Sequence, residues 1–224
     1  YHDHTLFFDD DGKIYLIWGN GKLRIAELRE DLSGVKEGTE KVLIENASAP
    51  AGSDIGLGAE GSQLFKVNGK YYLFNITWPR GGMRTVVIHR ADNIGGPYEG
   101  RIGLQDKGVA QGGLIDTPDG RWFSYLFRDY GAVGRIPYLV PVKWEYDWPV
   151  LGIDGKVPDM LDLPESKGLI PGIVAPDEFS RQKGDPALPL VWQWNHNPDN
   201  MLWSVHERKG YLRLRTGRID NDFL

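Results

Sequence analysis

The sequence predicts an all-β protein, and within that class a β-propeller, from three observations. A pattern of two apolar runs joined by a glycine turn occurs three times, with Gly12, Gly69 and Gly120 at equivalent positions. Each glycine follows aspartate or asparagine, and Asp-Gly or Asn-Gly between apolar runs is a strong hairpin signal. The copies are spaced by roughly 50 to 60 residues, which suits propeller blades of about four strands. No stretch has a sustained helical period, so we expect few and short helices.

Each copy of the repeat supplies its strands in the same order. The three hairpins are expected over residues 5–18, 61–74 and 113–127. A further strand is expected after each hairpin, over residues 22–28, 84–91 and 136–144. These runs are rich in aromatic and β-branched residues and are separated by Gly and Pro, which is typical of strands joined by tight turns.

The domain organisation follows from the place where the repeats end. Regular repeats weaken after Pro149, and the polar, proline-rich residues 180–189 indicate a domain boundary. We therefore expect a propeller domain over residues 1–178, which begins at its second blade. Residues 179–224 are expected to hold a linker and the first strands of a second β domain, which is too short to bury a core of its own. Those strands are expected over residues 190–194 and 211–215.

The composition excludes several classes of function. The chain has 224 residues, a net charge of −5 and no cysteine. A mildly acidic chain has no electrostatic attraction for nucleic acid or for an anionic membrane, and we expect neither as a partner. The absence of cysteine excludes disulfides, thiolate metal sites and cysteine nucleophiles. No apolar run approaches the roughly 18 residues of a membrane-spanning helix. The compartment stays open, and a secreted or periplasmic location in a bacterium is the hypothesis we prefer.

Two acidic residues stand ahead of equivalent hairpins. Asp3 precedes the first copy and Glu60 the second, whereas the third copy has no acid there. Inner strands of neighbouring blades begin near the propeller axis, so the two side chains are expected to lie close together. A pair of carboxylic acids is what most glycosidases use for catalysis. Glu60, between small residues, is the expected general acid in a partly dry pocket. Asp3 is expected to orient it and modulate its pKa by like-charge proximity. The alternatives are a solvated loop glutamate and a turn aspartate.

Three further residues are candidate substrate contacts. Gln111 occupies the slot in the third copy that corresponds to Glu60, and its amide suits the recognition of hydroxyl groups. Arg135 begins a strand and can hydrogen-bond a sugar hydroxyl while supporting a carboxylate. Trp78 lies on a glycine-rich turn, where its ring would wall a sugar subsite. A purely structural role is the alternative for each of the three.

Other polar patterns do not indicate a site. Residues 9–11 are three aspartates in one turn, which we expect to be solvated. The five histidines show no metal-ligand spacing. The chain has no phosphate-binding glycine loop followed by a helix and no Gly-x-Ser-x-Gly elbow.

Two segments together resemble glycoside hydrolase family 43. Residues 3–16 (DHTLFFDDDGKIYL) resemble its second-blade motif, and residues 60–73 (EGSQLFKVNGKYYL) its third-blade motif. The resemblance implies a five-bladed propeller, inversion of configuration and substrates of the xylan or arabinan type. It also implies that Glu60 is the general acid, that Asp3 modulates the pKa of that acid, and that Arg135, in the GRIPY segment, contacts the sugar. The tail from residue 192 to 214 resembles the opening of the β-sandwich domain of β-xylosidase-type members.

The chain departs from the family pattern in two ways. The family's general base is an aspartate of the first blade, and no residue here fills that role, so we expect this chain to be nearly inactive by itself. Many members carry a histidine, often associated with a cation on the propeller axis, where Gln111 stands. With glutamine there, we expect no cofactor and no metal.

These observations predict an exo-acting, inverting glycosidase, of the β-xylosidase or α-L-arabinofuranosidase type. Its expected substrate is a plant cell-wall polysaccharide or oligosaccharide that carries terminal xylose or arabinose, such as xylan or arabinoxylan. A carbohydrate-binding propeller without catalysis is the first alternative. A glycoside phosphorylase is the second, and it would need a basic cluster to hold phosphate, for which Arg135 is the one candidate.

Overall fold

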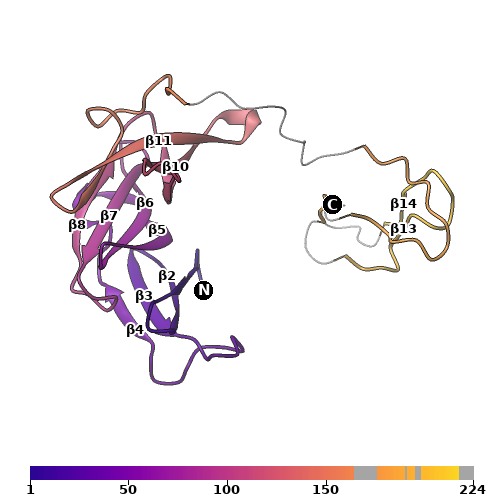
Figure 1. Cartoon of the computed structure of the whole chain (residues 1–224), viewed down its shortest axis with the longest axis horizontal. Helices are drawn as coiled ribbons and strands as arrows, with labels where there is room; N and C mark the ends of the chain where they lie inside the picture. The colour runs from indigo at the N-terminus through magenta and orange to yellow at the C-terminus, as the bar shows by residue number, and fades with distance from the viewer. Residues whose placement is uncertain (164–175, 190, 195–197, 217–224) are drawn as a thin grey trace. The chain divides into compact units, whose positions relative to one another are not determined.

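A computed structural model describes residues 1–163, 176–189, 191–194 and 198–216 of the chain (Figure 1). The chain divides into two compact units, Tyr1–Leu161 and Asp162–Leu224. Within the described residues, every strand of more than two residues lies in the first unit. No described helix is both long and apolar enough to cross a membrane.

The first unit consists of three four-stranded antiparallel sheets whose strand order follows the chain. The first sheet holds β1 (Thr5–Phe8), β2 (Ile14–Asn20), β3 (Lys22–Glu27) and β4 (Lys41–Ile44). The second holds β5 (Ile55–Val67), β6 (Lys70–Pro79), β7 (Thr85–Ala91) and β8 (Glu99–Leu104). The third holds β9 (Ala110–Asp116), β10 (Trp122–Asp129), β11 (Arg135–Glu145) and β12 (Trp148–Leu151). Helical structure in the described residues is limited to the 3-10 turns η1 (Ala49–Ala51) and η2 (Gly131–Val133), so the all-β prediction is confirmed.

The predicted hairpins form at the predicted turns. Gly12, Gly69 and Gly120 adopt φ angles of 81°, 77° and 82°, a region that glycine enters without steric cost. They lie in the turns β1–β2, β5–β6 and β9–β10, which join the first two strands of each sheet. The repeat seen in the sequence is therefore a repeat of four-stranded sheets.

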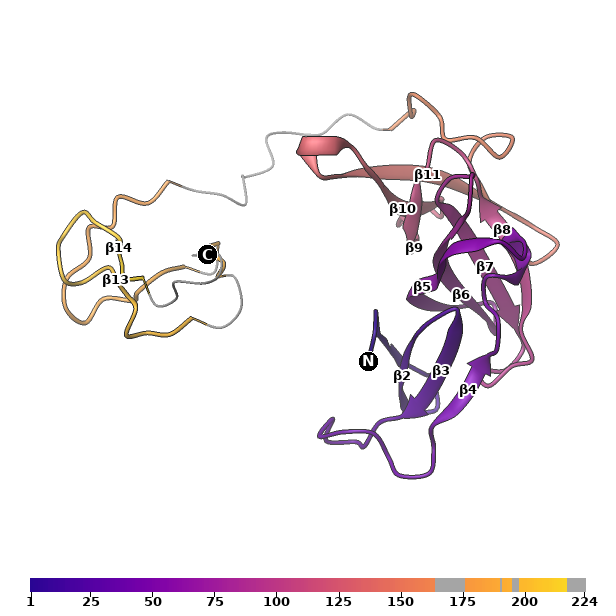
Figure 2. The same ribbon diagram turned by 180° about the vertical axis from the view of Figure 1, so that it is seen from behind.

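The three sheets are arranged side by side in a curved array (Figures 1 and 2). In both views β5 lies on the inner side of the array and β8 on the outer side. The first strand of the middle sheet, β5, contacts the first strands of both neighbours, β1 and β9. Residues at the starts of these inner strands are therefore brought together from distant parts of the sequence.

The middle sheet is buried on both of its faces, and β6 shows why. Tyr71 and Leu73 belong to the apolar cluster shared with the first sheet, whereas Tyr72 and Phe74 belong to the cluster shared with the third. Successive side chains of a strand point to opposite faces, so a strand covered on both sides reads as a continuous apolar run. This packing on both faces fixes the position of the middle sheet relative to the first and third sheets.

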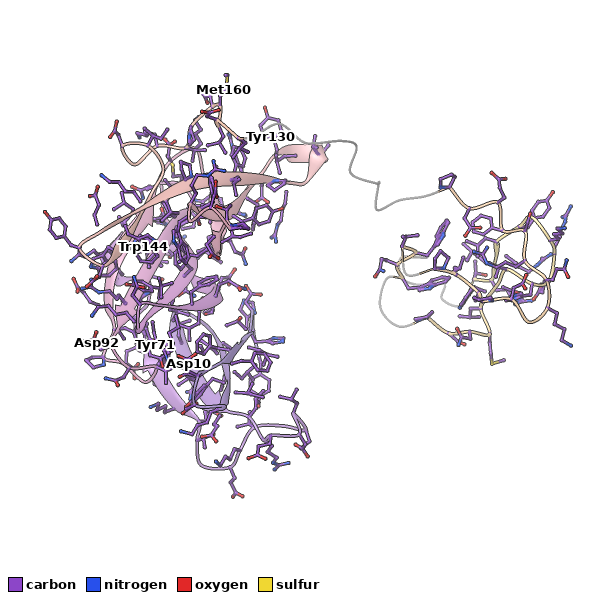
Figure 3. All side chains as sticks on the ribbon, in the orientation of Figure 1. Asp10, Tyr71, Asp92, Tyr130, Trp144 and Met160 are labelled. Atoms are coloured by element: carbon purple, nitrogen blue, oxygen red, sulfur yellow. The ribbon has the colours of Figure 1, made fainter. Side chains whose placement is uncertain are left out.

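One polar contact between sheets corrects the prediction of a solvated acidic turn. The side chain of Asp9 is only 6% exposed, and it accepts hydrogen bonds from Lys66 Nζ at 2.7 Å and Tyr71 Oη at 2.6 Å. Asp10, which is exposed, lies 2.9 Å from the same ammonium group, and Figure 3 shows Asp10 and Tyr71 close together. Burial by itself raises the pKa of Asp9, but the hydrogen bonds from Lys66 and Tyr71 outweigh it and hold that pKa below its ordinary value. The prediction was wrong for Asp9 because the partners come from the next sheet.

The second unit has little regular structure in its described residues. It contains the short antiparallel pair β13 (Trp203–Ser204) and β14 (Arg213–Leu214), the latter inside the predicted strand 211–215. Residues 191–194 form no strand, contrary to the prediction, and residue 190 lies outside the described residues. Within this unit an ion pair joins Asp177 to Arg181 at 2.5 Å.

Candidate active site

Glu60 lies in an irregular part of β5. The pairing of β5 with β6 shifts register three times between Ile55 and Gln63, so Glu60 lies inside the strand, not ahead of it as the sequence suggested. Buried Asn75, on β6, fastens this irregular backbone, because its Nδ2 donates to Glu60 O at 3.2 Å and to Ser62 Oγ at 2.9 Å. The carboxylate that results is mostly covered, with a side-chain exposure of 16%.

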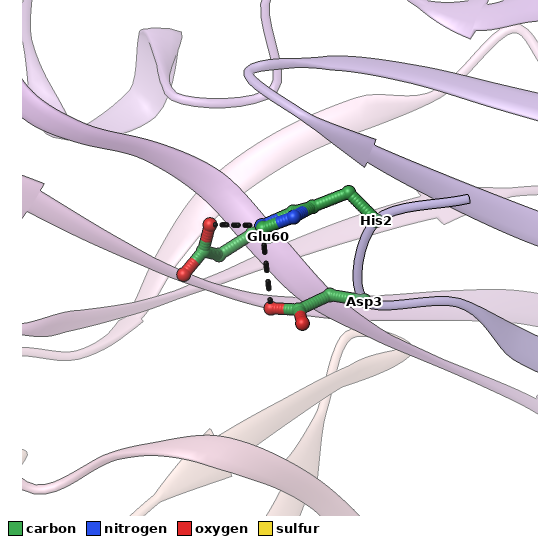
Figure 4. A group of neighbouring side chains, drawn as sticks. All are labelled: His2, Asp3 and Glu60. Atoms are coloured by element: carbon green, nitrogen blue, oxygen red, sulfur yellow. Dashed lines mark hydrogen bonds and ion pairs between the residues drawn. The ribbon is translucent and has the colours of Figure 1, made fainter. Parts of the chain in front are cut away.

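Asp3 lies beside Glu60, as predicted, and His2 lies between them (Figure 4). His2 Nε2 donates to Glu60 Oε2 at 2.9 Å and is 3.8 Å from Asp3 Oδ2. One oxygen of each carboxylate is within 4.8 Å of the other. That separation is too short for the acid and base of an inverting glycosidase, which stand roughly 6.5–9.5 Å apart to admit water. It suits an aspartate that influences the glutamate directly.

Gln111 joins the same group from the third sheet. It forms a bulge in β9, because its neighbours Ala110 and Gly112 pair with consecutive residues of β10 and leave it without a partner there. Its side chain packs over Gly61, where an added Cβ would lie 2.3 Å from Gln111 Nε2. Only glycine next to Glu60 therefore leaves room for this amide.

Trp78 and Arg135 belong to a second group, at the junction of the second and third sheets. Arg84 stacks on the Trp78 ring, 5.3 Å from its centroid, and forms an ion pair with Asp129. Asp129 Oδ1 is in turn 3.5 Å from Arg135 Nε. In the described part of the chain, no hydrogen bond or ion pair joins Arg135 to Asp3 or Glu60, so the expected support of a carboxylate goes to Asp129. Trp78 is 42% exposed, and its strand partner Leu57 lies three residues before Glu60.

Sequence reasoning missed two residues that contact Glu60. Asn20 Nδ2 donates to Glu60 Oε2 at 2.5 Å, and His2 donates to the same oxygen. The signals that were available are the Gly19-Asn20-Gly21 turn in the neighbouring repeat and the position of His2 next to Asp3.

His2, Asp3 and Glu60 are also the described side chains whose donor atoms could converge on a metal ion. His2 and Asp3 are exposed, and the hydrogen bond from His2 already occupies Glu60 Oε2. A structural metal site has a closed shell of ligands. Here the Glu60 carboxylate is instead held by a hydrogen bond, and the other two side chains are open to solvent.

The contact with Glu60 predicts a titration of His2. The hydrogen bond to Glu60, followed by the charge of Asp3, raises the pKa of His2 above its ordinary value of 6.5. The stabilisation from this contact is therefore fully present at acid pH and is lost as the pH rises through the raised pKa. NMR titration of the imidazole should show a midpoint above 6.5 that falls toward that value in Glu60→Gln. An unchanged midpoint in that variant would contradict the contact.

A curved array of four-stranded sheets with two neighbouring carboxylates at its inner strands has the parts that propeller members of one class of protein, the glycoside hydrolases, use. The chain belongs to the glycosyl hydrolases family 43, whose family model matches residues 2–149. A second model, described as the beta xylosidase C-terminal concanavalin A-like domain, matches residues 177–222.

Individual proteins show the same relation. The chain is 34% identical, over 99% of its length, to a putative beta-xylosidase of Xylanibacter ruminicola, of which it covers 42%. It is 27% identical, over 94% of its length, to a non-reducing end alpha-L-arabinofuranosidase of Bacteroides ovatus, of which it covers 41%. Among solved structures, a bifunctional GH43-CE protein of Bacteroides eggerthii is 74% identical with a TM-score of 0.86; the match covers 100% of this chain and 29% of that one. The chain thus spans less than half the length of these relatives.

Proposed function

We propose that the chain is part of an inverting glycosidase that removes terminal xylose or arabinose from xylan- or arabinoxylan-type polysaccharides and oligosaccharides. The observation that carries the proposal is the proximity of the carboxylates of Glu60, on β5, and Asp3, just before β1, whose nearest oxygens lie within 4.8 Å of each other. The names of the relatives, a putative beta-xylosidase and an alpha-L-arabinofuranosidase, support the two sugars.

In this proposal Glu60 is the general acid and Asp3 is its modulator. Glu60 Oε2 already accepts two hydrogen bonds, whereas no described residue hydrogen-bonds Oε1. Oε1 is therefore the oxygen that donates a proton to the departing glycosidic oxygen. Asp3 is proposed to modulate Glu60 through like-charge proximity, since a general acid must carry its proton before the bond breaks.

The water-activating base is assigned to no residue of this chain. The carboxylate that lies beside Glu60, Asp3, is too close to leave room for water. We assign the base to a further blade of the propeller, and we expect the isolated chain to be nearly inactive.

Gln111, Trp78 and Arg135 are proposed as substrate contacts. The packing of Gln111 against Gly61 supports a place beside the reacting bond. Trp78 and Arg135, linked by Arg84 and Asp129, have the exposed ring and the guanidinium group that suit a neighbouring sugar unit.

We also propose that the three sheets, within residues 1–178, are part of a five-bladed propeller that is incomplete in this chain, and that residues 179–224 begin a β-sandwich domain. Support for further blades comes from apolar side chains that are exposed on the two outer sheets. They are Leu6 and Phe8 on the first sheet and Ile115 and Tyr125 on the third. The match of residues 177–222 to a concanavalin A-like domain model supports the sandwich.

Hydrolysis assays on the native protein test the proposed function. We expect release of the aryl group from an aryl β-xyloside, an aryl α-L-arabinofuranoside or both, and the preferred sugar identifies the substrate. NMR of the first-formed sugar should show the inverted anomer. If the protein binds xylo- or arabino-oligosaccharides but releases nothing, the enzyme proposal is wrong and the carbohydrate-binding alternative replaces it.

A further inference from the structure

We propose that Asn20 is a positioning residue for the general acid. Its amide donates a hydrogen bond to Glu60 Oε2, so that this oxygen is always an acceptor. The proton that Glu60 transfers is therefore carried by Oε1. This inference rests on the proposed function, in which Glu60 is the acid. The contact that motivates it is the 2.5 Å hydrogen bond from Asn20 Nδ2 to Glu60 Oε2, between adjacent sheets.

The backbone delivers the Asn20 amide to this position. Asn20 is the last residue of β2, and the amide of the next residue, Gly21, donates to Ala59 O at 2.8 Å, directly before Glu60 in β5. On the other side, Ala47 N donates to Gly21 O at 2.8 Å. The Asn20 side chain is itself exposed, so its hold on Glu60 comes from this anchored turn and not from burial.

Gly58 leaves the space that the Asn20 amide needs. A Cβ at position 58 would lie 2.2 Å from Asn20 Oδ1, far inside van der Waals contact. With Oδ1 against the Gly58 backbone, Nδ2 faces Glu60, to which it donates. The sheet β5–β8 thus leaves room for the Asn20 amide in the orientation that donates to Glu60.

This orientation determines where the proton of Glu60 resides. An oxygen that accepts N–H groups from Asn20 and His2 has no room for a proton of its own, so protonation occurs on Oε1. The two donors are not equivalent, because an imidazole gains and loses protons whereas an amide always donates. Asn20 therefore keeps the proton on one oxygen at every working pH. A hydrogen-bond donor to a carboxylate also favours the charged form of that carboxylate, a preference that is lost with the donor.

The test compares Asn20→Ala and Asn20→Asp in the native protein. Asn20→Asp keeps the shape of the side chain but replaces the donor by a charged acceptor, whereas Asn20→Ala removes the donor without adding charge. We expect kcat to fall about 10- to 100-fold, part of the 10²–10⁴ that general acid catalysis contributes, with little change in KM. The basic limb of the pH profile of kcat/KM should move about one pH unit higher, and further in Asn20→Asp than in Asn20→Ala.

Two further variants make the result specific. Gly58→Ala should displace the Asn20 amide, together with the Gly21 backbone beside it, without removing the amide. It should therefore reproduce the shift of the basic limb, and the double variant with Asn20→Ala should shift no further. Asn93→Ala removes an exposed asparagine away from Glu60, and its profile should equal the wild type. Circular dichroism establishes that each variant is folded, and 13C NMR titration of the Glu60 carboxyl group checks the shift without turnover.

The outcomes separate this inference from the proposed function. If Asn20→Asp and Gly58→Ala retain the wild-type pH profile while Glu60→Gln is inactive, Asn20 has no positioning role and the glycosidase stands. If Glu60→Gln is as active as the wild type, Glu60 is not the acid, and the role of Asn20 falls with it.

Discussion

Glu60→Gln in the native protein is expected to lower kcat/KM by about 10²–10⁴-fold on substrates with poor leaving groups, such as xylobiose. The amide keeps the size of the carboxyl group, and its oxygen still accepts the hydrogen bonds that Asn20 and His2 donate to Glu60. The variant therefore preserves the geometry but has no proton to give to the glycosidic oxygen.

The leaving group makes this prediction specific to an acid. A dinitrophenyl glycoside departs without protonation, so its hydrolysis by Glu60→Gln should stay close to the wild-type rate. Glu45→Gln, at an exposed glutamate paired with Lys22, is the matched control and should be active on both substrates. Equal losses on xylobiose and on the dinitrophenyl glycoside would show that Glu60 acts in binding or in folding, and not as the proton donor.

Asp9→Ala is expected to destabilise the protein by about 3 kcal/mol, measured as the free energy of unfolding in urea. The Asp9 carboxylate is 6% exposed and joins the first sheet to Lys66 and Tyr71 of the second. Its removal leaves the phenol of Tyr71 without its acceptor and the ammonium group of Lys66 with only the exposed Asp10, which costs more than the loss of an exposed ion pair. Asp10→Ala is the control, because Asp10 is 83% exposed and its pair with Lys66 should contribute less than about 1 kcal/mol.

The same contact gives the pH dependence of stability. Because the pKa of Asp9 is lowered in the folded protein, its contribution is present above the ordinary carboxyl pKa of 3.8. It is lost as the pH falls through the lower folded pKa. The difference in unfolding free energy between the wild type and Asp9→Asn should therefore be constant at neutral pH and shrink below about pH 4. A difference that stays constant into acid would mean that Asp9 contributes through packing and not through its charge.

Much of the fold follows from local chemistry that the sequence displays. Asp-Gly and Asn-Gly turns at Gly12, Gly69 and Gly120 determine where the hairpins reverse, because these residues enter the left-handed region easily. The regular repeat then brings equivalent positions of neighbouring sheets together, which is why the sequence alone is enough to pair Asp3 with Glu60.

The sequence by itself thus determined the first three strands of each sheet, their repeat and the two carboxylates, since each depends on residues close together in the chain. The tertiary structure decided which polar groups meet across sheets: Lys66 with Asp9, and Asn20 with Glu60. Those contacts depend on strand register and on bulges, and a shift of one residue turns a side chain to the opposite face of its sheet. Local patterns do not specify such shifts, because a bulge is stabilised by partners that are distant in sequence, as Asn75 is for the bulge at Glu60.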